Sequence, residues 1–113
     1  MSVEDLNTID CIGIPIETPH EVNLGISDHL EWDASLDEHL YLLQEKINTY
    51  LRFIESGEIY QCFPPATPTT KKVIEIFFKY EPPTLANAFL NHVTDCLNEL
   101  GIELKMKVVE FCK

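Results

Sequence analysis

The sequence SLDEHLYLLQEKINTYLRFIESG, residues 35–57, contains the clearest secondary-structure signal of the chain. Its apolar residues recur at steps of three and four over about five turns, which is typical of one face of an amphipathic helix. Ser35 and Glu38 have the spacing of a capping box, and Gly57 can end the helix in a left-handed conformation. We therefore predict one long helix over this range, with its apolar face packed against the rest of the domain.

The segments on both sides of this helix alternate with the two-residue period of strands. Residues 9–16 and 22–26 flank a turn at 17–20, which predicts a hairpin with one buried face. Residues 58–71 contain Pro64, Pro65 and Pro68, which argue against a helix or a central strand and predict a long connection. A third strand over 72–80, a second helix from 81–84 to Gly101 and a fourth strand over 102–108 complete the pattern.

The predicted order β-β-α-β-α-β is that of a single α+β domain over residues 1–113. Each strand has one apolar face, so we expect a two-layer sandwich in which both helices cover the same face of one four-stranded sheet. The third and fourth strands, joined through the second helix, are expected to be parallel. On the other sheet face, Val73, Phe77 and Val109 lie beside lysines, which suggests a homodimer through that face or through an edge strand.

Negative charge is concentrated at the beginning of the chain. The first 45 residues contain eleven Asp and Glu and no Lys or Arg, while the rest contains eight of each, so the first part accounts for the whole net charge of −11. Such a field disfavours nucleic acid and anionic membranes and favours basic protein surfaces or cations. No apolar run reaches the ~18 residues of a membrane span, and the start MSVED does not resemble a signal peptide, so we expect a cytoplasmic protein.

The four cysteines, Cys11, Cys62, Cys96 and Cys112, lie far apart and form no CxxC pair. We therefore expect free thiols, most of them buried as small apolar side chains. We also expect that no cysteine has a local histidine or basic neighbour that activates its thiolate.

The densest polar cluster lies where the second strand leads into the first helix. Its acids and its only tryptophan are the best candidates for a surface that binds a basic protein partner, and self-association is the other option. As an alternative to a partner anchor, Trp32 can act as a plug that closes the end of the core. The predicted partner-binding residues are Asp28, His29, Glu31, Trp32, Asp33, Asp37 and Glu38.

A second hypothesis for the same cluster is a divalent-metal site or a metal-assisted enzyme, since carboxylates and imidazoles are suitable ligands. The same acids also suit an ordinary helix N-terminus. We predict no catalytic residue and no cofactor, because no known metal motif, nucleophile elbow or phosphate-binding glycine loop is present. A third option is that residues 59–70 close over a small-molecule pocket. The candidate metal ligands are His29, Glu31, Asp33 and His39.

Four segments of the chain resemble a small family of bacterial domains of unknown function. They are residues 9–14 (IDCIGI), 26–32 (ISDHLEW), 39–57 (HLYLLQEKINTYLRFIESG) and 78–83 (FKYEPP). The similarity extends over nearly the whole chain, and residues 44–57 are its most specific part. It implies a bacterial cytosolic protein and transfers no functional residue.

Overall fold

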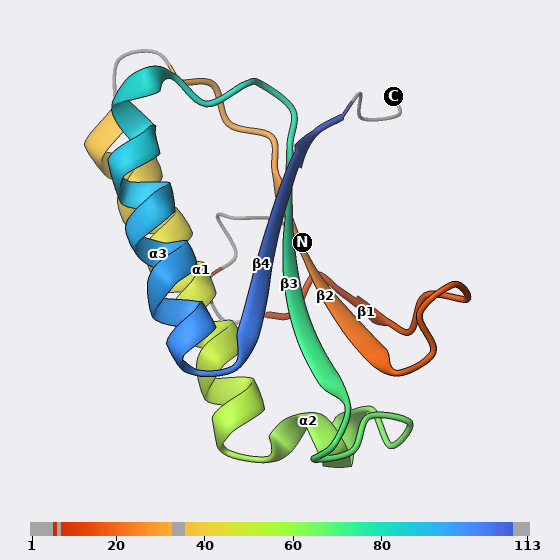
Figure 1. Ribbon diagram of the computed structural model, residues 1–113. Coiled ribbons are helices and arrows are strands. Elements are labelled where there is room, and N and C mark those ends of the chain that lie inside the picture. Colours follow the sequence, from red (N-terminus) through yellow and green to blue (C-terminus); the bar gives the residue numbers. More distant parts are fainter. Residues whose placement is uncertain (1–5, 7, 33–35, 110–113) are drawn as a thin grey trace.

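The computed structural model describes residues 6, 8–32 and 36–109. It is an α+β fold with one four-stranded mixed sheet (Figure 1). In chain order the elements are β1 (Cys11–Gly13), β2 (Glu21–Asp28), α1 (Leu36–Glu55), α2 (Glu58–Cys62), β3 (Lys71–Phe78), the 3-10 turn η1 (Thr84–Ala86), α3 (Asn87–Glu99) and β4 (Ile102–Val108).

The strands follow one another across the sheet in the order β1-β2-β3-β4. β1 is antiparallel to β2, with Cys11 opposite Gly25, and the other two pairings are parallel. The predicted element order matches the structure apart from the additional short helix α2, and the predicted parallel pairing of the last two strands is confirmed. β1 is shorter than the predicted strand, because the chain turns early, with the Thr18 amide donating to the Pro15 carbonyl.

Two helix ends illustrate how local sequence sets the element boundaries. Gly57 adopts a φ of 83°, so the left-handed end predicted for α1 is confirmed, whereas the predicted cap Ser35 lies outside the described residues. The prediction that residues 58–71 contain no helix is wrong. The short helix α2 ends before Pro64, the first proline of this segment, and its Ile59 is completely buried in the core.

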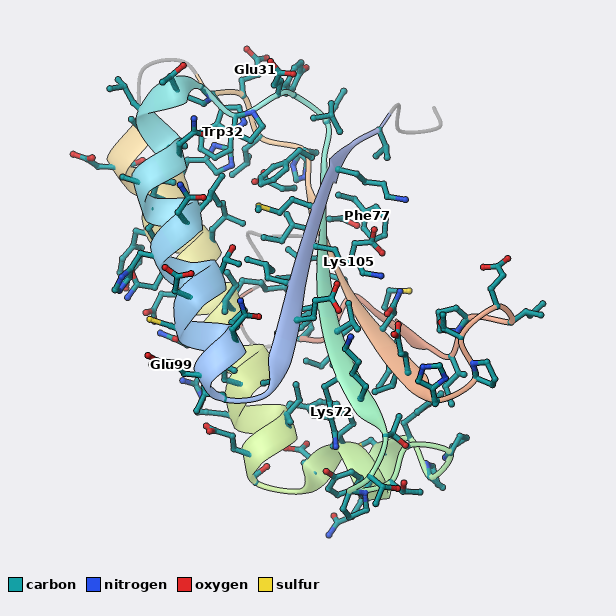
Figure 2. All side chains as sticks on the ribbon, viewed as in Figure 1. Glu31, Trp32, Lys72, Phe77, Glu99 and Lys105 are labelled. Carbon is teal, nitrogen blue, oxygen red and sulfur yellow. The ribbon has the colours of Figure 1, made fainter. Side chains whose placement is uncertain are left out.

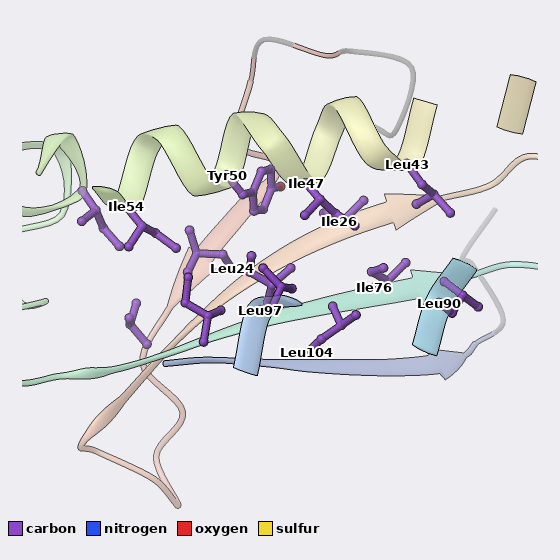
Figure 3. Packing of buried hydrophobic residues seen from close by; sticks show 14 of the residues in the cluster. Leu24, Ile26, Leu43, Ile47, Tyr50, Ile54, Ile76, Leu90, Leu97 and Leu104 are labelled. Carbon is purple, nitrogen blue, oxygen red and sulfur yellow. The ribbon is translucent and has the colours of Figure 1, made fainter. Parts of the chain in front are cut away.

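Figure 1 shows α1 and α3 on the same side of the sheet, and Figure 3 shows how their side chains meet those of the strands. The predicted apolar stripe of α1 contributes Leu43, Ile47, Tyr50 and Ile54, each of which is buried. This close packing supplies most of the driving force for folding. The other labelled residues in that cluster are Leu24, Ile26, Ile76, Leu90, Leu97 and Leu104.

The opposite sheet face carries polar and aromatic side chains. Lys107 lies 3.5 Å from Glu75 and its ammonium stands 5.7 Å from the ring centre of Phe77. Phe77 is half-buried and covers Gly25, where an added Cβ would stand 3.1 Å from the Phe77 ring. The neighbouring residues enclose a shallow hollow of about 290 Å³.

Candidate functional site

The junction between β2 and α1 is built on a buried pair of titratable side chains. Asp28, the last residue of β2, is 1% exposed, and His39 in the first turns of α1 is 3% exposed. One carboxylate oxygen of Asp28 lies 2.6 Å from His39 Nε2, and the other accepts a hydrogen bond of 3.1 Å from the Leu30 amide. This pair joins the end of the strand to the start of the helix.

Trp32 closes the end of the core over this pair. Its ring stacks on the His39 ring, with centroids 3.6 Å apart and an angle of 15° between the planes. The indole Nε1 donates a hydrogen bond of 3.1 Å to the Tyr80 carbonyl, and the Phe78 ring lies at 5.7 Å. These contacts favour the plug interpretation of Trp32 over an exposed anchor.

The remaining predicted partner-binding residues lie outside this buried pair. His29, Glu31, Asp37 and Glu38 are exposed, whereas Asp33 lies outside the described residues. Within the ranges that the structure describes, no ion pair involves the carboxylates of Glu31, Asp37 or Glu38. The predicted set is thus divided, because Asp28 is buried and cannot contribute to an exposed surface.

An exposed aromatic side chain accompanies these acids. Tyr41 follows Asp37 by four residues and Glu38 by three, so it lies on the same face of α1 one turn away. Its side chain is 60% exposed. We call Glu31, Asp37, Glu38 and Tyr41 the acidic junction. In Figure 2, Glu31 and Lys72 lie at opposite ends of the molecule.

The candidate metal ligands do not form a recognisable centre among the described residues, where no group of three His, Cys, Asp or Glu side chains could hold an ion. His39 uses Nε2 for Asp28, and its Nδ1 is buried without a hydrogen-bond partner. His29 and Glu31 are exposed, while His39 is enclosed. No observation within 8–32 and 36–109 therefore favours the metal hypothesis.

A second buried polar cluster, which the sequence analysis did not anticipate, lies further along α1. Lys46 is completely buried, and its ammonium contacts the Asp10 carboxylate at 2.8 Å and the Thr8 carbonyl at 2.7 Å. A signal for it exists in the sequence, because Lys46 lies three residues after Leu43 and four before Tyr50, on the apolar stripe. A lysine on a buried helix face needs an acidic partner.

Tyr50 completes this second cluster. Its hydroxyl accepts a hydrogen bond of 2.8 Å from the Asp10 amide and donates a short one to the Gly25 carbonyl. Burial raises the pKa of the Tyr50 phenol well above its usual value of 10.0. The side chain thus ties α1 to β2 and to the residue just before β1 as a neutral phenol.

The expectation that most cysteines are buried is wrong for the described ones, since Cys11, Cys62 and Cys96 are all exposed free thiols. Cys112 lies outside the described residues. The expectation that no cysteine has a histidine neighbour is also wrong, because Cys96 Sγ lies 3.6 Å from His92 Nε2. Their spacing of four residues on a helix is the signal that was missed. Both line a hollow of about 220 Å³ between α1 and α3.

Comparisons with known proteins add one assignment to this description. We found no significant match to the chain among curated proteins or among solved structures. Among the described helices, none is both long and apolar enough to cross a membrane. Over residues 1–110 the sequence matches the model of the Family of unknown function (DUF6572), and the chain therefore belongs to that family, as its resemblance to domains of unknown function predicted.

Proposed function

We propose that the chain is a protein-interaction module, a two-layer α+β sandwich with both long helices on one sheet face, and that the acidic junction binds a basic surface of another protein. The observation that carries the proposal is the exposed set of carboxylates at Glu31, Asp37 and Glu38, for which the described chain provides no ion-pair partner. Uncompensated charge of one sign attracts a partner of the opposite sign.

The basic side chains are largely occupied elsewhere. Lys71 lies 2.6 Å from Glu103, and Lys107 lies 3.5 Å from Glu75. Lys46 is buried with Asp10, and the ammonium of Lys72 donates to the carbonyls of Thr67 and Pro68. Acids in the sheet and the core are therefore paired with lysines of the same chain. The acids of the acidic junction remain available to basic groups of another protein.

The junction is also held in place before any partner arrives. The Asp28–His39 pair anchors the first turns of α1, and the Trp32 indole is fixed by its stacking on His39. A surface that is already ordered loses less conformational entropy on binding. Tyr41 adds an exposed aromatic ring next to the acids, and tyrosine is common among residues that dominate binding energies.

Two triple variants with equal charge loss test this proposal. The junction variant is E31Q/D37N/E38Q, and the control E55Q/E58Q/E99Q removes three exposed acids elsewhere. In Figure 2, Glu99 lies far from Glu31. Proteins captured by the wild-type chain from lysate of its source cells are identified, and the association rate of each is measured at low and physiological salt.

We expect the junction variant to slow association by about tenfold or more at low salt and to weaken the salt dependence, because rim charges act mainly on the association rate. The control should retain wild-type kinetics. Tyr41→Ala should instead increase the dissociation rate. If both triple variants slowed association equally, the net charge of the chain would explain the effect. That result would contradict the proposal that the acidic junction is the binding surface.

A further inference from the structure

One edge of the sheet, the outer side of β4, is unpaired in the described chain. The Val109 amide donates to the Phe78 carbonyl at 2.8 Å, so the backbone groups of the odd-numbered residues of β4 point to β3. Backbone groups of successive residues point to opposite sides of a strand. Those of Ile102, Leu104, Met106 and Val108 therefore point outward and are open to pair with another strand.

The apolar side chains along this edge are only partly covered. Ile102 and Leu104 are buried beneath α3, but Met106 is 39% exposed and Val108 is 50% exposed. Leu100, just before the strand, is 52% exposed. An open edge with exposed apolar side chains is a surface suited to pairing with another strand.

We propose that β4 pairs antiparallel with β4 of a second copy of the chain, about a two-fold axis that passes through Leu104. In this register Ile102 lies opposite Met106 of the second copy, and Leu100 lies opposite Val108. On the other face Glu103 lies opposite Lys105 in both directions, as the symmetry of such an interface requires. Charge complementarity therefore identifies the occupant of the edge as another copy of this chain.

Neighbouring registers place like charges opposite one another, which destabilises an antiparallel pair. An axis at Glu103 would oppose that residue to itself, and an axis at Lys105 would do the same for the lysine. An axis at Met106 would oppose Lys105 to Lys107. Lysines on an edge strand normally prevent pairing, but in the register centred on Leu104 each Lys105 meets Glu103 of the second copy. The Glu103 carboxylate contacts Lys71 of its own chain at 2.6 Å, and its second oxygen can accept from Lys105.

Helix α3 is compatible with this arrangement. It turns Phe89, Val93 and Cys96 toward α1, where they line the hollow between the helices. The helical period of 3.6 residues places four uncharged residues on the flank of α3 that faces away from α1. Although the chain has a net charge of −11, this flank therefore carries no acid that would repel a second copy. Figure 1 shows α3 in front of α1 and β4 in front of β3, on the side of the molecule nearest the viewer. The flank consists of Asn87, Asn91, Thr94 and Asn98.

The test compares Lys105→Glu with Lys107→Glu, which changes the charge equally but lies opposite Gly101 in the proposed register. Sedimentation equilibrium over a range of concentrations should give twice the 13.0 kDa chain mass for the wild type and for the Lys107→Glu control. Lys105→Glu should weaken the dimer by at least tenfold, and the double variant E103K/K105E should restore it. Circular dichroism confirms that each variant is folded.

Hydrogen exchange gives an independent measurement. The amides of Leu104 and Met106 should be protected in the wild type and exchange faster in Lys105→Glu. A wild-type monomer at every concentration would overturn the proposal, and so would an equal loss of dimer in both lysine variants. These outcomes are distinct from those of the acidic junction, because neither lysine belongs to that surface.

Discussion

Helix α1 carries two buried acid–base pairs that differ in how completely their polar atoms are satisfied. Lys46 meets the Asp10 carboxylate and the Thr8 carbonyl, and Asp10 also accepts from the Ser27 amide at 3.1 Å. His39 meets Asp28 through Nε2, but its Nδ1 is buried without a partner. Only the first pair is fully satisfied among the described residues.

This difference follows from the number of hydrogen bonds that each base can make. An ammonium group has three donors and no acceptor, so buried Lys46 depends on the oxygens of Thr8 and Asp10. An imidazole has only two ring nitrogens and therefore needs fewer partners. The comparison also shows that two of the eleven early acids, Asp10 and Asp28, are internal partners rather than surface charges.

The largest effect is expected for Asp10→Ala, which breaks the Lys46 pair. Removing one member of a buried pair costs about 3–5 kcal/mol, because the other charge stays buried without its counter-ion. Urea unfolding followed by circular dichroism measures the loss. The control Glu17→Ala removes an exposed acid and should change stability by less than about 0.5 kcal/mol. Equal stabilities of the two variants would show that Lys46 does not need Asp10.

Tyr50→Phe should have an intermediate effect, about 1–3 kcal/mol, since it leaves the Gly25 carbonyl and the Asp10 amide without partners. The pH dependence provides a second measurement. Because the pKa of Tyr50 is raised in the folded state, its stabilisation is fully present below pH 10.0, the usual value, and is lost as the pH rises further.

Unfolding of Tyr50→Phe should therefore depend less steeply on pH above 10.0 than unfolding of the wild type. Tyr41→Phe, at an exposed site, should retain the wild-type slope. Parallel pH profiles for the wild type and Tyr50→Phe would mean that the phenol is not buried as described.

The smallest effect is expected for Asp28→Asn, about 1 kcal/mol, because asparagine keeps the size of the aspartate side chain and its oxygen can still accept from the Leu30 amide. Urea unfolding monitored by the fluorescence of Trp32, the only tryptophan, measures it. Asp95→Asn on the exposed side of α3 is the control. If Asp28→Asn lowered the free energy of unfolding as much as Asp10→Ala, the two buried pairs would not differ in how strongly they stabilise the fold.

Periodic apolar patterns predicted most of the fold. The stripe through Leu43, Ile47 and Ile54 located α1, because burial repeats with the helical period. The pattern did not predict α2, since five residues are too few to show a period. The buried pair of Asp10 and Lys46 connects residues that are 36 positions apart, and local spacing contains no information on such a contact.

The candidate site was predicted only in part for the same reason. Composition identified the junction between β2 and α1 as the densest polar cluster. It could not separate Asp28, which the fold buries, from Glu31, Asp37 and Glu38, which remain exposed. Whether an acid of this cluster is buried or exposed depends on whether its side chain points toward α1 and the core or toward solvent.

The parallel pairing of β2 with β3 also determines when the chain can fold. Glu21 pairs with Lys71, fifty residues later, so the centre of the sheet cannot form during synthesis until β3 has left the ribosome. Until then the apolar face of α1 has no sheet to cover it, and only the β1–β2 hairpin can form locally. Distant pairings of this kind slow folding and expose nascent chains to aggregation. Rapid completion of the second half of the chain therefore shortens the time for which the apolar face of α1 is uncovered.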